Sequence, residues 1–317
     1  MDENNKIVLS KVRNFGDNIG DTFNLIRHGF KPIGQACLYV TGPLVLIVSI
    51  IMGFINAETM GFMFDTMKNP ADIQKSNDAM LNMFSSNGVL FGAGYIVIIL
   101  FSFIIIALMQ AYAYEYMILY QNKDYETITY KDIIAGGKKN GLKIAFTNLG
   151  IIFIFIAGVF FLVLLSVIAA AISEILAVFI PIIVMISMFS GFYFMIMFIL
   201  TPAIRVFESK GFWKSLVRSV KLMYGNFWNT FGLLFILMIA VSILGIVFMI
   251  PYIAVVGFMA FNVISGPAAN PVYMKPLIII TSSFLGFSTF LYIILFFSIG
   301  FKYFTLIEKK EGLQVSQ

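Results

Sequence analysis

Two residue types that carry much of protein chemistry are nearly absent from this chain of 317 residues, which has one cysteine, Cys37, and one histidine, His28. One cysteine cannot form an internal disulfide, and this pair cannot supply the ligands of a zinc site. The sequence also lacks the Gly-x-Ser-x-Gly, Gly-x4-Gly-Lys-Ser/Thr and His-Glu-x-x-His motifs. We therefore expect no metal, no cofactor and no enzymatic activity.

Charged residues are also scarce, at 12% of the chain, against about 25% in ordinary soluble domains. Apolar residues make up 60%, and the mean hydropathy is +0.94. Several apolar runs reach the roughly 20 residues that a helix needs to cross a bilayer. Backbone groups in hydrocarbon must be satisfied within helices. We therefore predict an all-α polytopic membrane helix bundle, with residues 1–317 forming a single integral membrane domain.

Six segments are predicted to cross the membrane, at residues 36–56, 89–117, 144–172, 175–201, 228–250 and 277–304. Only Ser173 and Glu174 separate the third from the fourth, which predicts a tight helical hairpin. Of the 21 Lys and Arg residues, 18 lie on the side of the membrane that holds both termini. The positive-inside rule places that side, and so both termini, in the cytoplasm. The net charge of +5 thus indicates topology and not nucleic-acid binding.

The segments between the spans carry weaker signals. Residues 1–35 form a cytoplasmic amphipathic segment, and we expect its helix to end at Gly29 and Pro32. Residues 57–88 are expected to form an external loop, with a turn at Asn69-Pro70.

Pro251 leaves two readings open for the chain that follows it. Either the fifth span continues as a very long helix, or residues 252–264 make a separate helix at the outer surface. We prefer the separate helix, because proline removes a helix hydrogen bond.

Three cytoplasmic stretches share one plan of polar helix, glycine-containing turn and entry into a span. They are residues 27–33, 139–145 and 224–230. The pattern predicts a threefold repeat of surface helix plus helical hairpin.

The second span continues into tyrosines such as Tyr112 and Tyr116, which we expect to form an interfacial aromatic belt. Glu115 lies at the same level as Arg205, and we predict an interfacial ion pair between them. A transporter or channel would instead use these two residues, with Gln110, Thr147 and Asn148, to line a water-accessible path.

Residues 202–227 contain the clearest physical signal, a cytoplasmic basic amphipathic helix. Its basic side chains recur at helical spacing: Lys210, Lys214, Arg218 and Lys221. Its apolar face is predicted to comprise Phe212, Trp213, Leu216, Val217, Val220, Met223 and Tyr224. Such a helix lies on the membrane surface and attracts anionic lipid headgroups. The alternative is that it only fixes the topology and packs under the bundle.

The same stretch carries a family resemblance through Pro202, Glu208, Gly211, Ser215, Ser219, Leu222, Gly225 and Trp228. This order resembles the bacterial membrane domain attached to some glycerophosphoryl diester phosphodiesterases, and also the stand-alone YciC-like membrane proteins. The resemblance implies a multi-span protein of the bacterial cytoplasmic (inner) membrane. The phosphodiesterase chemistry belongs to a separate soluble domain that has no counterpart here.

These patterns favour a non-enzymatic integral membrane protein that scaffolds the envelope or organises its lipids. The predicted partners are membrane lipids with anionic headgroups, envelope proteins as further partners, and no nucleic acid. The alternative is the membrane subunit of a transporter or channel.

Overall fold

The structure, a computed structural model, describes residues 6–68, 73–172, 180–265 and 271–312. The described residues are helical with short connections, and they contain no strand. The longer helices are α1 (Phe15–Ala36), α2 (Gly42–Lys68), α3 (Ile73–Asn122), α4 (Tyr130–Ile172), α6 (Ile180–Met197), α9 (Phe227–Ser265), α10 (Pro271–Gly286) and α11 (Ile293–Ile307). The shorter helices are α7 (Thr201–Phe207), α8 (Phe212–Met223), the 3-10 turns η3 (Tyr125–Thr127) and η4 (Phe287–Tyr292), and the π-helical turns η1 (Cys37–Thr41) and η5 (Glu308–Gly312).

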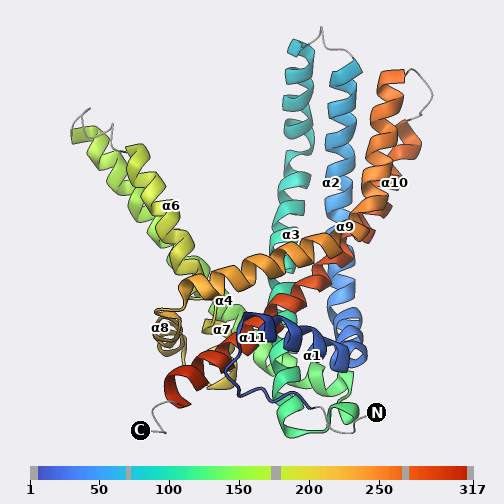
Figure 1. Cartoon of the computed structure of the whole chain (residues 1–317). Helices are drawn as coiled ribbons and strands as arrows, with labels where there is room; N and C mark the ends of the chain where they lie inside the picture. The colour runs from blue at the N-terminus through green and yellow to red at the C-terminus, as the bar shows by residue number, and fades with distance from the viewer. Residues whose placement is uncertain (1–5, 69–72, 173–179, 266–270, 313–317) are drawn as a thin grey trace. The chain divides into compact units, whose positions relative to one another are not determined.

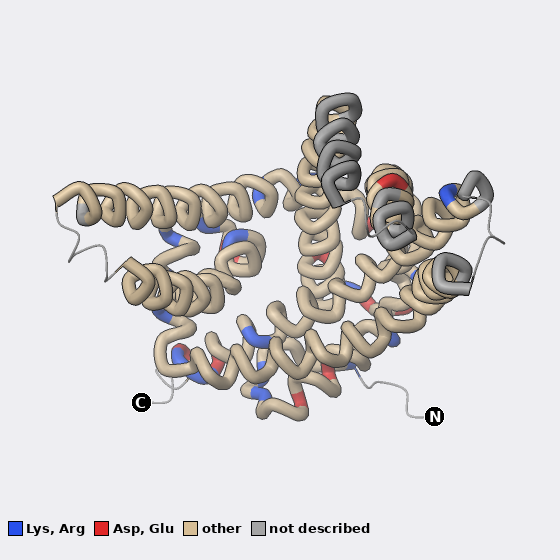
Figure 2. The backbone as a smooth tube through the Cα atoms, turned by 90° about the horizontal axis from the view of Figure 1, so that it is seen from above, with Lys and Arg blue, Asp and Glu red and all other residues tan. Residues whose placement is uncertain are grey.

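Six helical stretches in the described residues are long and apolar enough to cross a membrane. They are Phe15–Gly61, Gly88–Asn122, Tyr130–Ile172, Ile180–Phe207, Phe227–Phe261 and Met274–Gly312. Charged residues are sparse along the longest helices, as the mostly tan tube of Figure 2 shows. The prediction of an all-α polytopic membrane protein is confirmed.

The chain divides into two compact units, and each is described by itself. The first comprises Met1–Ile33, Gln110–Met238 and Ile294–Gln317. The second comprises Gly34–Met109 and Ile239–Ile293.

In the second unit, α2 packs closely along α10, and the two run side by side in Figure 1. The approach is close because Gly286 of α10 faces Ser49 of α2, and any Cβ at Gly286 would overlap the Ser49 side chain. Towards the other end of the pair, Lys275 and Glu58 form an ion pair of 2.7 Å. Small residues at helix contacts are typical of membrane bundles.

In the first unit, α4 and α6 run side by side as a pair (Figure 1). Phe155 and Phe198 meet between them, edge to face, with ring centroids 6.2 Å apart. No residue in the most apolar stretch of α4 is buried by protein. This stretch is apolar all round, as expected of a helix that is surrounded by lipid.

The tyrosines at the end of α3 form the interior of the first unit. Tyr112, Tyr114, Tyr116 and Tyr120 are all fully buried. Tyr112 fits because its ring lies against Gly137 of α4, where a Cβ would overlap it. The predicted interfacial belt is therefore wrong for these residues, which pack against protein.

Two predicted helix ends are also wrong, because proline does not stop the helix at either place. Pro32 lies inside α1, where Ile33 and Ala36 are buried and hold the last turn in place. Pro251 lies inside α9, which continues to Ser265, so residues 252–264 are not a separate helix. Proline removes one helix hydrogen bond, and helices in membranes tolerate that loss more often than helices in soluble proteins do.

The expected external loop at residues 57–88 is mostly helical. Helix α2 continues to Lys68 and α3 begins at Ile73, because nothing between residues 57 and 68 breaks the helix. The predicted turn at Asn69-Pro70 and the hairpin at Ser173 and Glu174 lie outside the described residues.

Only one of the three glycine turns of the proposed repeat exists as a turn. Gly29 lies within α1 and Gly141 within α4, whereas Gly225 forms the turn between α8 and α9. A glycine in a helix costs only about 1 kcal/mol, so the first two stretches continue as helices.

Candidate lipid-headgroup site on helix α8

Helix α8 is set up by the short helix that precedes it. Pro202 occupies the first turn of α7, where its missing N–H costs no hydrogen bond. Glu208 ends α7, Ser209 adopts a left-handed conformation with φ 51°, and Gly211 is extended at the start of α8. Four residues, 208–211, thus connect α7 to α8.

One face of α8 is buried in the interior of the first unit. It consists of Ser215, Leu216, Ser219, Leu222 and Met223. The hydroxyl of Ser219 donates to the carbonyl oxygen of Met197 at the end of α6, at 2.6 Å. The small serine side chains bring the helix close to its neighbours and leave its other face exposed.

Glu208 forms the centre of a cluster of charges at the start of α8. Its carboxylate pairs with Lys210 and with Arg218, each at 2.5 Å, and accepts a hydrogen bond of 3.1 Å from the Tyr303 hydroxyl. Arg218 also pairs with Glu311 at 2.8 Å. The cluster joins α7 and α8 to α11 and η5.

The cluster shifts the pKa values of Glu208 and Arg218. Burial alone would raise the pKa of Glu208, but hydrogen bonds from Arg218 and Lys210 outweigh it and hold that pKa below its usual value. The hydrogen bond to Glu311, assisted by Glu208, raises the pKa of the Arg218 guanidinium. Both shifts favour the charged forms of Glu208 and Arg218.

The exposed face of α8 carries a shallow pocket of about 460 Å³. Its lining contains all four of the predicted basic residues together with two apolar ones: Lys210, Trp213, Lys214, Val217, Arg218 and Lys221. Trp213 is 67% exposed and Val217 is 50% exposed. The pocket thus combines cationic groups with apolar surface.

The predicted apolar face of α8 is divided in the structure. Leu216 and Met223 are buried in the first unit, whereas Trp213, Val217 and Tyr224 are exposed on the same side as the lysines. An exposed tryptophan among lysines is typical of a helix at the membrane interface.

The charges in the pocket differ in their availability. Lys210 and Arg218 are engaged by Glu208 and Glu311. Within the described part of the chain, Lys214 and Lys221 have no acidic partner. These two lysines are the free cations of the pocket.

The end of α8 is fixed by a turn and by the C-terminal region. Gly225 has φ 78°, a left-handed conformation that favours glycine. Lys310 donates to the carbonyl oxygens of Lys221 and Tyr224, at 2.7 and 2.9 Å. Trp228, at the start of α9, is 78% exposed. Sequence reasoning did not find the roles of Glu311 and Lys310, because no local pattern links residues so far apart.

The predicted ion pair between Glu115 and Arg205 is wrong, because the two side chains bond to other residues. Glu115 accepts a hydrogen bond of 2.9 Å from Asn140, and Arg205 donates to the Thr147 hydroxyl at 2.8 Å. Both partners lie on α4, which offers each side chain a nearer group.

The other polar residues proposed for a water-accessible path also bond within the protein. Asn148 donates to Gln110 at 3.2 Å. In the residues that the structure describes, no group of three or more His, Cys, Asp or Glu side chains could hold a metal ion.

Comparisons with protein-family models, with curated proteins and with solved structures find no match to this chain. The six long apolar helices among the described residues are those of a membrane protein.

Proposed function

We propose that this protein binds anionic lipid headgroups in the α8 pocket and organises lipids or protein assemblies of the bacterial envelope, without enzymatic activity. The proposal includes the cytoplasmic membrane as its location and an inward-facing α8, as the distribution of Lys and Arg predicts. The resemblance of residues 202–228 to multi-span envelope proteins supports this location.

The observation that carries the proposal is the composition of the α8 pocket. Lys214 and Lys221 supply cations without internal partners, and Trp213 and Val217 supply apolar surface beside them. Basic residues near an anionic membrane surface contribute about 1 kcal/mol each. Two free lysines therefore predict a preference of roughly tenfold or more for anionic over neutral lipid.

Lipid retention tests the proposal directly. Lys214→Glu with Lys221→Glu should strongly reduce the phosphatidylglycerol that remains bound to the purified protein in native mass spectrometry. The matched control is Lys131→Glu with Lys138→Glu, two exposed lysines on α4. Equal retention by the two double variants would argue against an α8 site.

A further inference from the structure

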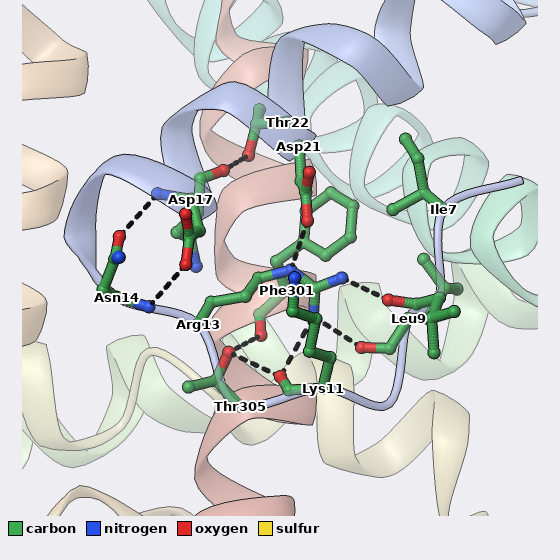
Figure 3. Close-up of polar contacts among 12 residues, drawn as sticks. Ile7, Leu9, Lys11, Arg13, Asn14, Asp17, Asp21, Thr22, Phe301 and Thr305 are labelled. Atoms are coloured by element: carbon green, nitrogen blue, oxygen red, sulfur yellow. Dashed lines mark hydrogen bonds and ion pairs between the residues drawn. The ribbon is translucent and has the colours of Figure 1, made fainter. Parts of the chain in front are cut away.

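The N-terminal segment Lys6–Arg13, here called the strap, is held against the first unit by its last residue. The Arg13 side chain is fully buried and pairs with Asp21 of α1 at 2.8 Å. Its guanidinium also donates to the carbonyl oxygens of Val8, Leu9 and Lys11 (Figure 3). One arginine thus folds the strap back on itself and fastens it to α1.

Further contacts fix the strap at both ends. The Arg13 guanidinium lies over the ring of Phe301 of α11, 4.4 Å from its centroid. The backbone N–H of Ile7 donates to the Tyr120 hydroxyl at 3.0 Å, and Lys6 donates to the carbonyl oxygen of Lys123 at 3.1 Å. The strap is therefore a built part of the fold.

A polar pocket of about 450 Å³ lies between the strap and α1. The polar residues of its lining are Lys6, Lys11, Asp21, Asn24, Arg27 and His28. Asp21 contributes the one carboxylate of the lining, and Arg13 is bound to it. The pocket therefore has an excess of positive charge.

Three donors of this pocket are available to a ligand. The side chains of Lys11, Asn24 and Arg27 are exposed, and in the part of the chain that the structure describes they have no hydrogen-bond or ion-pair partner. Lys6 uses its ammonium group on two backbone carbonyls at the end of α3. The one carboxylate of the lining is already paired with Arg13, so a bound cation would find no free acidic partner. An anion would find several unpaired donors, so the lining favours an anionic ligand.

We propose that the pocket between the strap and α1 binds a phosphate group, with Lys11 and Arg27 as its cationic ligands and Asn24 as a neutral donor. The planar guanidinium of arginine matches the oxygens of a phosphate, and lysine adds a point charge. The phosphate belongs either to a lipid headgroup or to a soluble phosphate compound. This inference is independent of the function proposed for α8.

Inorganic phosphate is the first probe, applied to the full-length protein in neutral detergent at constant ionic strength. Phosphate should raise the melting temperature of the wild type more than chloride does, because a ligand of the folded state stabilises it. Lys11→Gln with Arg27→Gln should weaken the apparent phosphate affinity by about tenfold per cation removed. Replacing Arg27 with lysine instead of glutamine should restore part of the phosphate response, because lysine keeps the positive charge.

A matched variant separates this site from general charge effects. Lys131→Gln with Lys138→Gln, at two exposed lysines of α4, should keep the phosphate response. A response that survives in the Lys11/Arg27 variant, or is lost equally in both double variants, overturns the proposal.

Phosphatidic acid in nanodiscs of otherwise neutral lipid is the second probe, and its retention is measured by native mass spectrometry. If inorganic phosphate stabilises the protein, a soluble phosphate suffices as ligand. If only phosphatidic acid binds, and Lys11→Gln with Arg27→Gln removes it, the source is the lipid headgroup. If neither probe distinguishes this variant from the wild type, the proposal fails.

Discussion

Glu208 holds together the charged residues at the start of α8. Its carboxylate accepts from Lys210, Arg218 and Tyr303, so replacing it with a neutral amide weakens three interactions at once. We expect Glu208→Gln to lower the free energy of unfolding by about 1–2 kcal/mol, because hydrogen bonds to charged groups contribute roughly that much and solvent screens the partly exposed partners Lys210 and Arg218. Thermal melts of the two proteins in the same detergent would measure it.

The contribution of Glu208 to the stability of the fold should depend on pH. The folded-state pKa of Glu208 lies below its ordinary value of 4.5, so the carboxylate stabilises the fold above that pH. Its contribution is lost as the pH falls through the lower, folded-state pKa. The difference between wild type and Glu208→Gln should therefore shrink at acid pH. Glu126→Gln, at an exposed carboxylate of η3, is the control, and an equal effect there would contradict the assigned role.

At the scale of the element, local signals predicted where helices exist better than where they end. The apolar runs identified every span, because a long apolar segment has few alternatives to a membrane helix. Pro32 and Pro251 predicted helix ends, but α1 and α9 continue through both prolines. The four basic residues that line the α8 pocket were found by spacing alone, since they recur at helical intervals.

The turn after α8 gives a prediction about backbone conformation. Gly225→Ala should destabilise the protein by about 1 kcal/mol, because its φ of 78° is unfavourable for a residue with a Cβ. Gly20→Ala, in the open middle of α1, should instead stabilise by roughly 0.5–1 kcal/mol. Unfolding curves that show the same sign for both would contradict this account of the turn.

At the scale of the whole molecule, sequence reasoning failed where contacts depend on how helices are rotated and joined. Glu115 and Arg205 were paired by depth, yet each is bound by a residue of α4. Glu311 reaches Arg218 from 93 positions away, and no periodicity indicates such a contact. Hydropathy predicts how deep a residue lies in the membrane. It does not predict which neighbouring helix the side chain faces.

The orientation in the membrane gives a prediction for the entire chain. In a Cys37→Ala background, single cysteines at Lys214 and Lys309 should react with a membrane-impermeant thiol reagent only from the cytoplasmic side. A cysteine at Lys275 should react only from the opposite side, because the positive-inside rule separates these residues. Labelling of all three from one side would refute the proposed topology.

The claim that α8 contacts anionic lipid is tested most directly through its tryptophan. Trp213 and Trp228 are the two tryptophans of the chain, so Trp228→Phe leaves Trp213 as the reporter. In proteoliposomes, brominated phosphatidylglycerol should quench Trp213 fluorescence more than brominated phosphatidylcholine does, and Lys214→Gln with Lys221→Gln should remove that preference. Equal quenching by the two lipids in the parent protein, or no quenching by either, would contradict the account.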